Sequence, residues 1–239
     1  MESLTWFVLL LAGLTCTHAV GTSETIQNLP SICQVEFRVF LVWTHNCACS
    51  VLTTGHIISV NSCFQASPSN RQIRLGTATS GWGGITREVG SIINHPLADL
   101  TVVRLTNLVW FGPTIQNVPI VPQGFSVPEN VPLSIAGWGY TAQGGLFTNP
   151  YLYRAWLESK NITLCMNQHP GRVTTDNLCV GLIGSAGRDF DSDDAGAPIL
   201  YEGFLTGLAS FGAASSNNNL PIVATAIGPY TNWIVGAAV

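Results

Sequence analysis

The stretch His95-Pro96-Leu97-Ala98-Asp99-Leu100-Thr101-Val102-Val103-Arg104-Leu105 contains a proline turn, one carboxylate and then an apolar run. A run of β-branched and aliphatic residues that begins directly after a turn is typical of a buried β-strand. Similar short runs, each bounded by Gly, Pro, Asn or Ser, lie at Gln34 to Val42, Ser50 to Thr54, Gln72 to Leu75, Leu133 to Ala136 and Pro198 to Leu200. Many short strands separated by turns predict an all-β domain of the sandwich or barrel type.

Helix is expected in two places only, around Tyr151 to Met166 and from Pro229 to Val235, because apolar residues recur there at helical spacing. The 24 glycines and 13 prolines of the whole chain interrupt it too often for long helices. Beyond the first twenty residues we find no linker, repeat or low-complexity block. The remaining length fits one large all-β domain or two small ones.

The composition excludes several classes of function. Only 9% of the 239 residues are charged, against about 25% in an average soluble domain, while 46% are hydrophobic. Such a chain can bury a large core, so a disordered or coiled-coil protein is excluded. The formal net charge is −4 and Lys160 is the sole lysine, so there is no basic stripe to neutralise phosphates. We expect no nucleic-acid partner.

The first residues have the pattern of a secretory signal. An apolar run from Leu4 to Leu14 ends in Thr17-His18-Ala19, which is a small-x-small cleavage pattern. The run is too short to span a bilayer, so no membrane partner is expected. We therefore predict a signal peptide over residues 1–19, a mature domain over residues 20–239 and an extracellular location. Removal of the signal leaves six cysteines, enough for three disulfides.

Eight segments carry a resemblance when they are taken in order. They are Leu29-Pro30-Ser31-Ile32; Cys47 with Cys63; His95-Pro96 with Asp99 to Leu105; Ala136-Gly137-Trp138-Gly139; Thr175-Asp176-Asn177-Leu178 between Cys165 and Cys179; Gly187-Arg188-Asp189 through Pro198; Ser210-Phe211-Gly212; and Tyr230 to Ile234. Together they resemble the chymotrypsin-fold serine proteases, specifically insect trypsin-like enzymes. The resemblance implies two six-stranded antiparallel β-barrels with a C-terminal helix, a cleft between the barrels, and disulfides Cys47–Cys63 and Cys165–Cys179.

The catalytic positions that the resemblance implies are degenerate. Hydrolysis by this constellation needs a hydroxyl nucleophile, an imidazole base, a carboxylate that orients it and an oxyanion hole. The base position, directly before Cys63, is Ser62, and the nucleophile position is Ala195. The carboxylate survives as Asp99, while the oxyanion glycine is replaced by Asp193. Because a methyl group cannot attack a carbonyl and a serine hydroxyl is not basic, we expect an inactive homologue that is not an enzyme.

Two alternatives would retain chemistry in the same cleft. His56, six residues before Ser62, is the nearest candidate for a displaced base, although a packed or surface histidine is the simpler interpretation. Ser192 or Ser62 could be the nucleophile, but neither has an identifiable base. Residual serine endopeptidase activity is therefore kept as an alternative.

The resemblance also assigns a specificity pocket. Asp189 stands at the position of the trypsin-type carboxylate on the pocket floor, while Ile222 replaces a glycine at the entrance and should fill much of the slot. The two cysteines that usually brace the pocket read Asp191 and Ser215. The remaining cysteines, Cys33 and Cys49, could pair with each other, form an intermolecular bond or stay free.

Acidic residues gather in one segment, at Asp189, Asp191, Asp193 and Asp194. A solvated loop and a site for a cation or basic ligand are both open, but the spacing and glycine of a calcium loop are missing, so no metal or cofactor is expected. Signal removal would expose Val20, whose α-amino group we expect to pair with Asp194. The sequon Asn161-Ile162-Thr163 is either glycosylated or unused.

The functional expectation follows from these positions. We expect a secreted, non-catalytic homologue that binds secreted proteins, peptides or protease inhibitors along Ser210-Phe211-Gly212 by strand addition, as an adaptor or decoy in digestion or defence. A structural or storage component of a secretion is the alternative, because low charge favours association.

Overall fold

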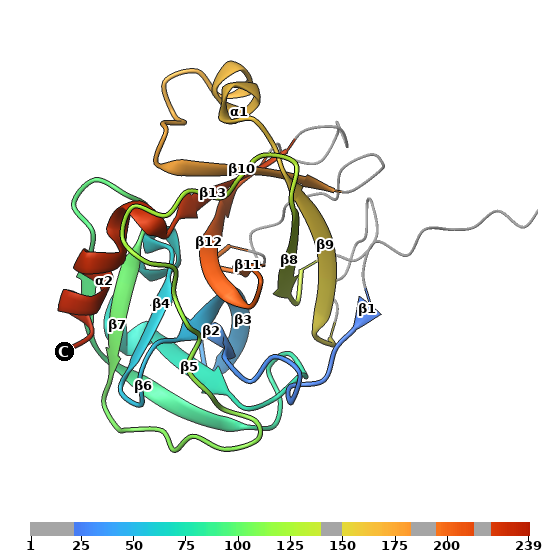
Figure 1. Cartoon of the computed structure of the whole chain (residues 1–239). Helices are drawn as coiled ribbons and strands as arrows, with labels where there is room; N and C mark the ends of the chain where they lie inside the picture. The colour runs from blue at the N-terminus through green and yellow to red at the C-terminus, as the bar shows by residue number, and fades with distance from the viewer. Residues whose placement is uncertain (1–21, 140–149, 183–194, 213–220) are drawn as a thin grey trace, which may run out of the picture.

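The computed structural model describes residues 22–139, 150–182, 195–212 and 221–239 (Figure 1). The strands are β1 (Thr22–Ser23), β2 (Ile32–Val39), β3 (Val42–Val51), β4 (His56–Ser59), β5 (Arg71–Leu75), β6 (Ile85–Asn94), β7 (Thr101–Leu105), β8 (Pro132–Gly137), β9 (Tyr153–Ser159), β10 (Asn177–Leu182), β11 (Pro198–Tyr201), β12 (Phe204–Phe211) and β13 (Ile222–Ala226). The helices are the short 3₁₀ turns η1 (Asn61–Phe64), η2 (Pro68–Asn70) and η4 (Gly228–Tyr230), and the α-helices α1 (Ile162–Gln168) and α2 (Thr231–Ala237).

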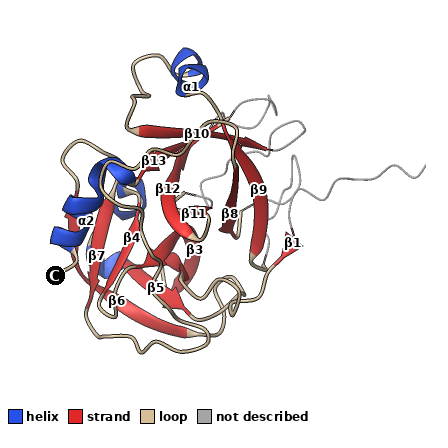
Figure 2. Cartoon of the chain, in the orientation of Figure 1, coloured by secondary structure: helices blue, strands red, loops and turns tan. Residues whose placement is uncertain are grey.

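The strands form two closed antiparallel barrels. The first has the order β2-β3-β4-β7-β6-β5. The second has the order β9-β10-β13-β12-β11-β8, is closed by pairing of β8 with β9, and carries β1 on β9. Figure 2 shows α1 and α2 outside the barrels. The expected all-β fold of two six-stranded antiparallel barrels with a C-terminal helix is confirmed.

The prediction of a helix from Tyr151 to Met166 is wrong in its first half. Residues Tyr153–Ser159 form strand β9, in which Ala155, Leu157 and Ser159 are buried at a period of two. The helix α1 begins only at Ile162, where the Asn161 side chain accepts a hydrogen bond from the N–H of Thr163. Pairing of β9 with β8 and β10 overrides the helical spacing of its apolar residues.

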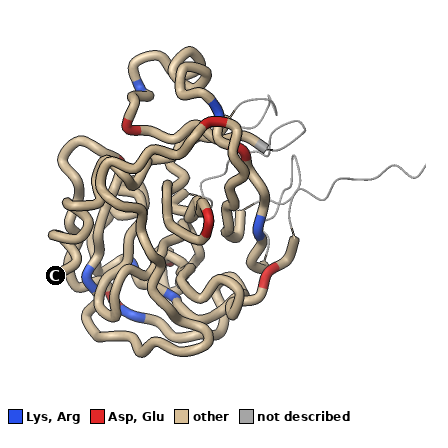
Figure 3. The backbone as a smooth tube through the Cα atoms, viewed as in Figure 1, with Lys and Arg blue, Asp and Glu red and all other residues tan. Residues whose placement is uncertain are grey.

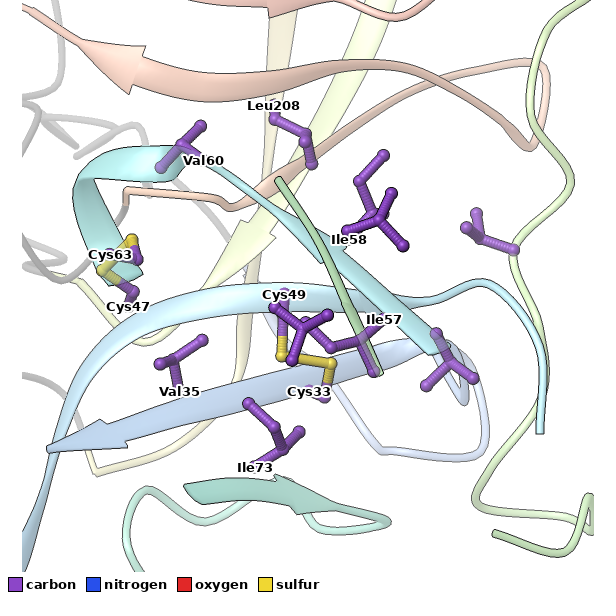
Figure 4. Close-up of a cluster of buried hydrophobic side chains, with 14 of the residues drawn as sticks. Cys33, Val35, Cys47, Cys49, Ile57, Ile58, Val60, Cys63, Ile73 and Leu208 are labelled. Atoms are coloured by element: carbon purple, nitrogen blue, oxygen red, sulfur yellow. A yellow bond between two sulfur atoms is a disulfide. The ribbon is translucent and has the colours of Figure 1, made fainter. Parts of the chain in front are cut away.

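The larger core cluster joins the two barrels. Ile58 and Val60, on and after β4, belong to one buried cluster with Leu208 of β12, and Figure 4 shows these side chains close together. Ile227 and Ile234, which follow the second barrel in the sequence, are buried in the same cluster. The barrels therefore share apolar contacts rather than touching only through their loops.

The described part of the chain contains three disulfides. The structure pairs Cys47 with Cys63 and Cys165 with Cys179, as the resemblance implies. It also pairs Cys33 with Cys49, which lie directly opposite each other on β2 and β3 (Figure 4). Of the three alternatives for Cys33 and Cys49, the structure contains the intramolecular bridge.

Charged residues are thinly spread along the described chain (Figure 3). Among the described residues Glu36 is fully buried, and its carboxylate accepts hydrogen bonds from Arg74 at 2.6 Å and from Gln72 at 2.5 Å. Within the described ranges, every helix is too short or too polar to span a bilayer.

Candidate functional site

Asp99 lies in the turn before β7, where the two barrels meet. The turn is built on His95, whose Nδ1 accepts hydrogen bonds from the N–H groups of Leu97 and Ala98. One carboxylate oxygen of Asp99 accepts the Ser62 N–H at 3.1 Å, and the other accepts the Ser210 hydroxyl at 2.5 Å.

The Asp99 main chain is tied to the second barrel as well. Its carbonyl accepts the hydroxyl of Thr225, on β13, at 2.9 Å. The hydroxyl donors therefore come from β12 and β13 of the second barrel, while the carboxylate belongs to the first. Asp99 therefore links the first barrel to the second.

Ser62 is brought to Asp99 by the short turn η1. It is exposed, and the next residue, Cys63, is buried and bonded to Cys47 of β3. Among the described residues, the Asp99 carboxylate accepts hydrogen bonds from a hydroxyl and from a main-chain N–H, and not from an imidazole. The structure thus brings positions 62 and 99 into direct contact.

His56 lies away from this contact. It is opposite Arg104 on the neighbouring strand β7, whereas Ser59, at the other end of β4, is opposite Thr101. Asp99 precedes Thr101, so His56 lies at the far end of the strand pair, roughly 10 Å along β4 from Ser59. Burial and the nearby Arg104 charge lower the pKa of His56, whose Nδ1 is 2.9 Å from the Thr53 hydroxyl.

Ala195 begins the turn that enters β11. Its side chain is buried, and its carbonyl accepts the N–H of Ala48 at 2.8 Å. The next residue, Gly196, has φ +77° and donates its N–H to the Ala209 carbonyl at 2.8 Å. A Cβ on Gly196 would lie 2.2 Å from both the Ala48 carbonyl oxygen and the Ser59 hydroxyl. Glycine is therefore required here, and it holds position 195 against the first barrel.

The segment Ser210-Phe211-Gly212 ends β12 beside Asp99. Ala209 pairs with Ala224 and Phe211 pairs with Val223, so Ser210 is the extra residue of a β-bulge. On the other side of β12, pairing with β11 extends only as far as Leu208. Beyond the Ala209 contacts with the 196–197 turn, this edge of the segment faces no strand among the described residues.

Phe211 has two neighbours that the sequence analysis did not select. The Arg172 guanidinium lies over its ring, 4.3 Å from the centroid, and the His169 ring meets it edge-on at 5.3 Å. The signal in the sequence is the turn dipeptide Pro170-Gly171 between them, which brings the two side chains to one place.

Ile222, on β13, is 6% exposed and is buried in a cluster with Val180 and Ala224. Several of the predicted site residues lie outside the described residues, namely Val20, Asp189, Asp191, Ser192, Asp193, Asp194 and Ser215. Within the ranges that are described, no group of three or more His, Cys, Asp or Glu side chains could hold a metal ion.

A family model described as Trypsin matches residues 19–234. The chain belongs to the trypsin family. A relative named "Trypsin" from Phaedon cochleariae is 27% identical over 253 residues, covering 95% of this chain and 96% of the relative. "Trypsin, alkaline C" from Manduca sexta is 26% identical over 226 residues, covering 90% of this chain and 88% of the relative.

Solved structures show that the trypsin-family fold extends over the chain. Mouse neuropsin, titled a serine protease expressed in the limbic system of the brain, has a TM-score of 0.80 at 21% identity and covers 92% of this chain and 99% of its own. A scabies mite protein titled an inactivated protease paralogue has a TM-score of 0.81 at 20% identity, and the match covers 92% of this chain and 96% of the mite protein.

The names of the trypsin relatives contradict one expectation of the sequence analysis. The residues at positions 62 and 195 lead to the expectation that the chain is not an enzyme, yet the relatives are named trypsins. That expectation is withdrawn. The two substitutions abolish hydrolysis only if no other side chain supplies the nucleophile and the base. Residues 183–194, which contain other candidates such as Ser192, lie outside the described ranges.

Proposed function

We propose that this trypsin-family protein acts by binding extended protein or peptide segments along Ser210-Phe211-Gly212, in the cleft beside Asp99. The observation that carries the proposal is the edge of β12 beyond Ala209, which faces no strand among the described residues. Main-chain pairing at such an edge gives affinity without requiring any bond to be cleaved. An adaptor or a decoy for protease inhibitors is the role that fits this mode.

The proposal includes secretion of the mature chain. Removal of residues 1–19 would leave Val20 at the N-terminus, and its α-amino group would pair with Asp194. Asn161 would carry a glycan, because it is exposed at the start of α1, where its Nδ2 donates a hydrogen bond to Glu129 at 2.9 Å. A glycan there would replace one of the two Nδ2 protons and leave the helix cap in place.

A second candidate function is peptide hydrolysis in the same cleft, which the names of the relatives favour. It needs a nucleophile other than Ala195, which carries only a methyl group, and a base other than Ser62. Among the described residues, Asp99 accepts hydrogen bonds from the Ser62 N–H and the Ser210 hydroxyl and not from an imidazole. The two candidates differ in whether the bound segment is released intact.

One experiment tests both. The purified secreted protein is titrated with blocked hexapeptides and with macromolecular serine-protease inhibitors, while binding is followed by calorimetry and cleavage by mass spectrometry. Gly212→Pro removes the N–H that would pair with the ligand, and Gly212→Ala is the matched control that keeps it.

We expect binding that Gly212→Pro weakens about fivefold to tenfold and that Gly212→Ala leaves little changed. Cleavage that copurifies with the protein supports the second candidate. Equal weakening by the two variants, or no binding to any probe, contradicts strand addition at this edge.

A further inference from the structure

The most distinctive feature beside the proposed binding edge is the cation on Phe211. Arg172 is exposed, and its guanidinium carbon lies 4.3 Å from the ring centroid. A guanidinium stacked on a ring uses its flat face and leaves its N–H groups pointing outward in the plane. Those donors remain available to a ligand that lies along the same strand.

Main-chain hydrogen bonds, a disulfide and a glycine turn hold Arg172 in place. The main-chain N–H of Arg172 donates to the His169 carbonyl at 3.1 Å, and the main-chain N–H of His169 donates to the Cys165 carbonyl at 2.9 Å. Cys165 is bonded to Cys179 of β10. Gly171 supplies the φ of +74° that closes the turn. Disulfide, helix end and turn together place Arg172 over Phe211.

The charge of Arg172 is not neutralised within the described part of the chain. The three ion pairs found there join Arg74 to Glu36, Arg154 to Glu24 and Lys160 to Glu158. The His169 imidazole meets the edge of the Phe211 ring, and its Nε2 is buried without a hydrogen-bond partner among the described residues.

We propose that Arg172 and Phe211 form a subsite that selects an acidic side chain in the segment bound along residues 210–212. This inference rests on the proposed binding function and names the class of its ligand. An Asp or Glu carboxylate can accept two parallel hydrogen bonds from the outward edge of the guanidinium. An aromatic or aliphatic side chain is a poorer fit, because Arg172 already covers a face of the ring.

The alternation of an extended segment explains how one ligand side chain reaches this place. A peptide paired with the edge of residues 210–212 directs every second side chain to the same face. The side chain on the Phe211 face then meets the edge of the guanidinium, while its neighbours along the segment point away.

The test uses alanine-based blocked hexapeptides in which one position at a time carries Glu or Gln. Dissociation constants are measured for the full mature protein, for Arg172→Gln and for Arg104→Gln, which removes an exposed guanidinium on β7 of the first barrel. Arg172→Lys serves as a further variant that keeps the charge and loses the planar fork.

We expect one peptide position at which Glu binds about threefold to tenfold more tightly than Gln. The preference should vanish in Arg172→Gln, weaken in Arg172→Lys, and persist in Arg104→Gln. Peptides that bind without any preference for Glu, or a preference that survives in Arg172→Gln, overturn the subsite and leave the binding function standing. Absence of binding by every peptide overturns the binding function itself, and the subsite with it.

Discussion

Asp99 of the first barrel is bonded to the second barrel through its carboxylate and through its main-chain carbonyl. Its carboxylate accepts one side-chain hydroxyl, from Ser210, and one main-chain N–H, from Ser62. We predict that Asp99→Ala lowers the free energy of unfolding by about 2 kcal/mol, because both donors lose their partner. Chemical denaturation measures the change.

Ser62→Ala is the matched control, since it retains the N–H that bonds to Asp99. Its free energy of unfolding should stay within about 0.5 kcal/mol of the unmodified protein. If both variants lose the same stability, the Asp99 carboxylate does not tie the barrels as described.

Gly196 is a residue that the geometry does not allow to carry a side chain. A Cβ at this position would overlap the Ala48 carbonyl oxygen and the Ser59 hydroxyl, and φ is +77°. We predict that Gly196→Ala costs about 3 kcal/mol or more in free energy of unfolding. Gly124→Ala provides the comparison, because φ there is +79° but the space is open, so only the backbone cost of about 1 kcal/mol applies. Equal losses would contradict a steric role for position 196.

His56 gives the protein a predicted dependence on pH. Burial and then the Arg104 charge lower its pKa from 6.5 in the folded state, so the unfolded chain takes up a proton more readily. The free energy of unfolding should therefore fall as the pH drops below 6.5, and the loss should level off below the lowered pKa. Urea titrations at about pH 7.5 and about pH 5 should show a smaller drop for His56→Gln than for the unmodified protein.

At the residue level, a motif can locate a position only within a short segment of the chain. Position 62 could be located from Cys63, and Asp99 from the turn that precedes its strand. The partners of Asp99 could not be foreseen in the same way: the Thr225 hydroxyl comes from a strand 126 positions away in the sequence. The stacking of Arg172 on Phe211 likewise depends on the packing of α1 against β10, which the Pro170-Gly171 turn does not specify by itself.

At the level of elements, strand β9 shows the limit of reading periodicity. Leu152 and Ala155 are spaced as on a helix, yet Ala155 and Leu157 face the barrel core as in a strand. Since β9 closes the second barrel on β8, the choice between helix and strand is made by pairing with distant segments. The apolar runs bounded by turns were sufficient to predict the β class, but not every strand of the two barrels.

The Cys33–Cys49 bridge offers a test on a single pair of strands. It links β2 to β3 across directly opposed residues and closes a loop with a sequence separation of 16. We predict that Cys33→Ala combined with Cys49→Ala lowers the free energy of unfolding by about 3 kcal/mol, because the unfolded chain regains the loop entropy. Peptide mapping without reduction should recover the two cysteines in one linked fragment. Recovery as free thiols or as an intermolecular bond would contradict the structure.

On the scale of the whole molecule, the shared core predicts how the protein unfolds. Leu208 of the second barrel lies in one buried cluster with Ile58 and Val60 of the first. The barrels should therefore lose structure together, in one transition with the same midpoint by far-ultraviolet circular dichroism and by tryptophan fluorescence. Two separated midpoints would indicate that each barrel is stable by itself.

The position of α2 has a consequence for the order in which the protein can be completed. Tyr230 and Trp233 contact the ring of His95 in the first barrel at 4.7 and 4.9 Å, and Ile234 is buried in the cluster that the barrels share. Tyr230, Trp233 and Ile234 are translated after the last strand of the second barrel. The first barrel is synthesised first, so it leaves the ribosome with an apolar surface that stays uncovered until residues 230–234 have been made. The first barrel can therefore complete its packing only after the second barrel has been synthesised.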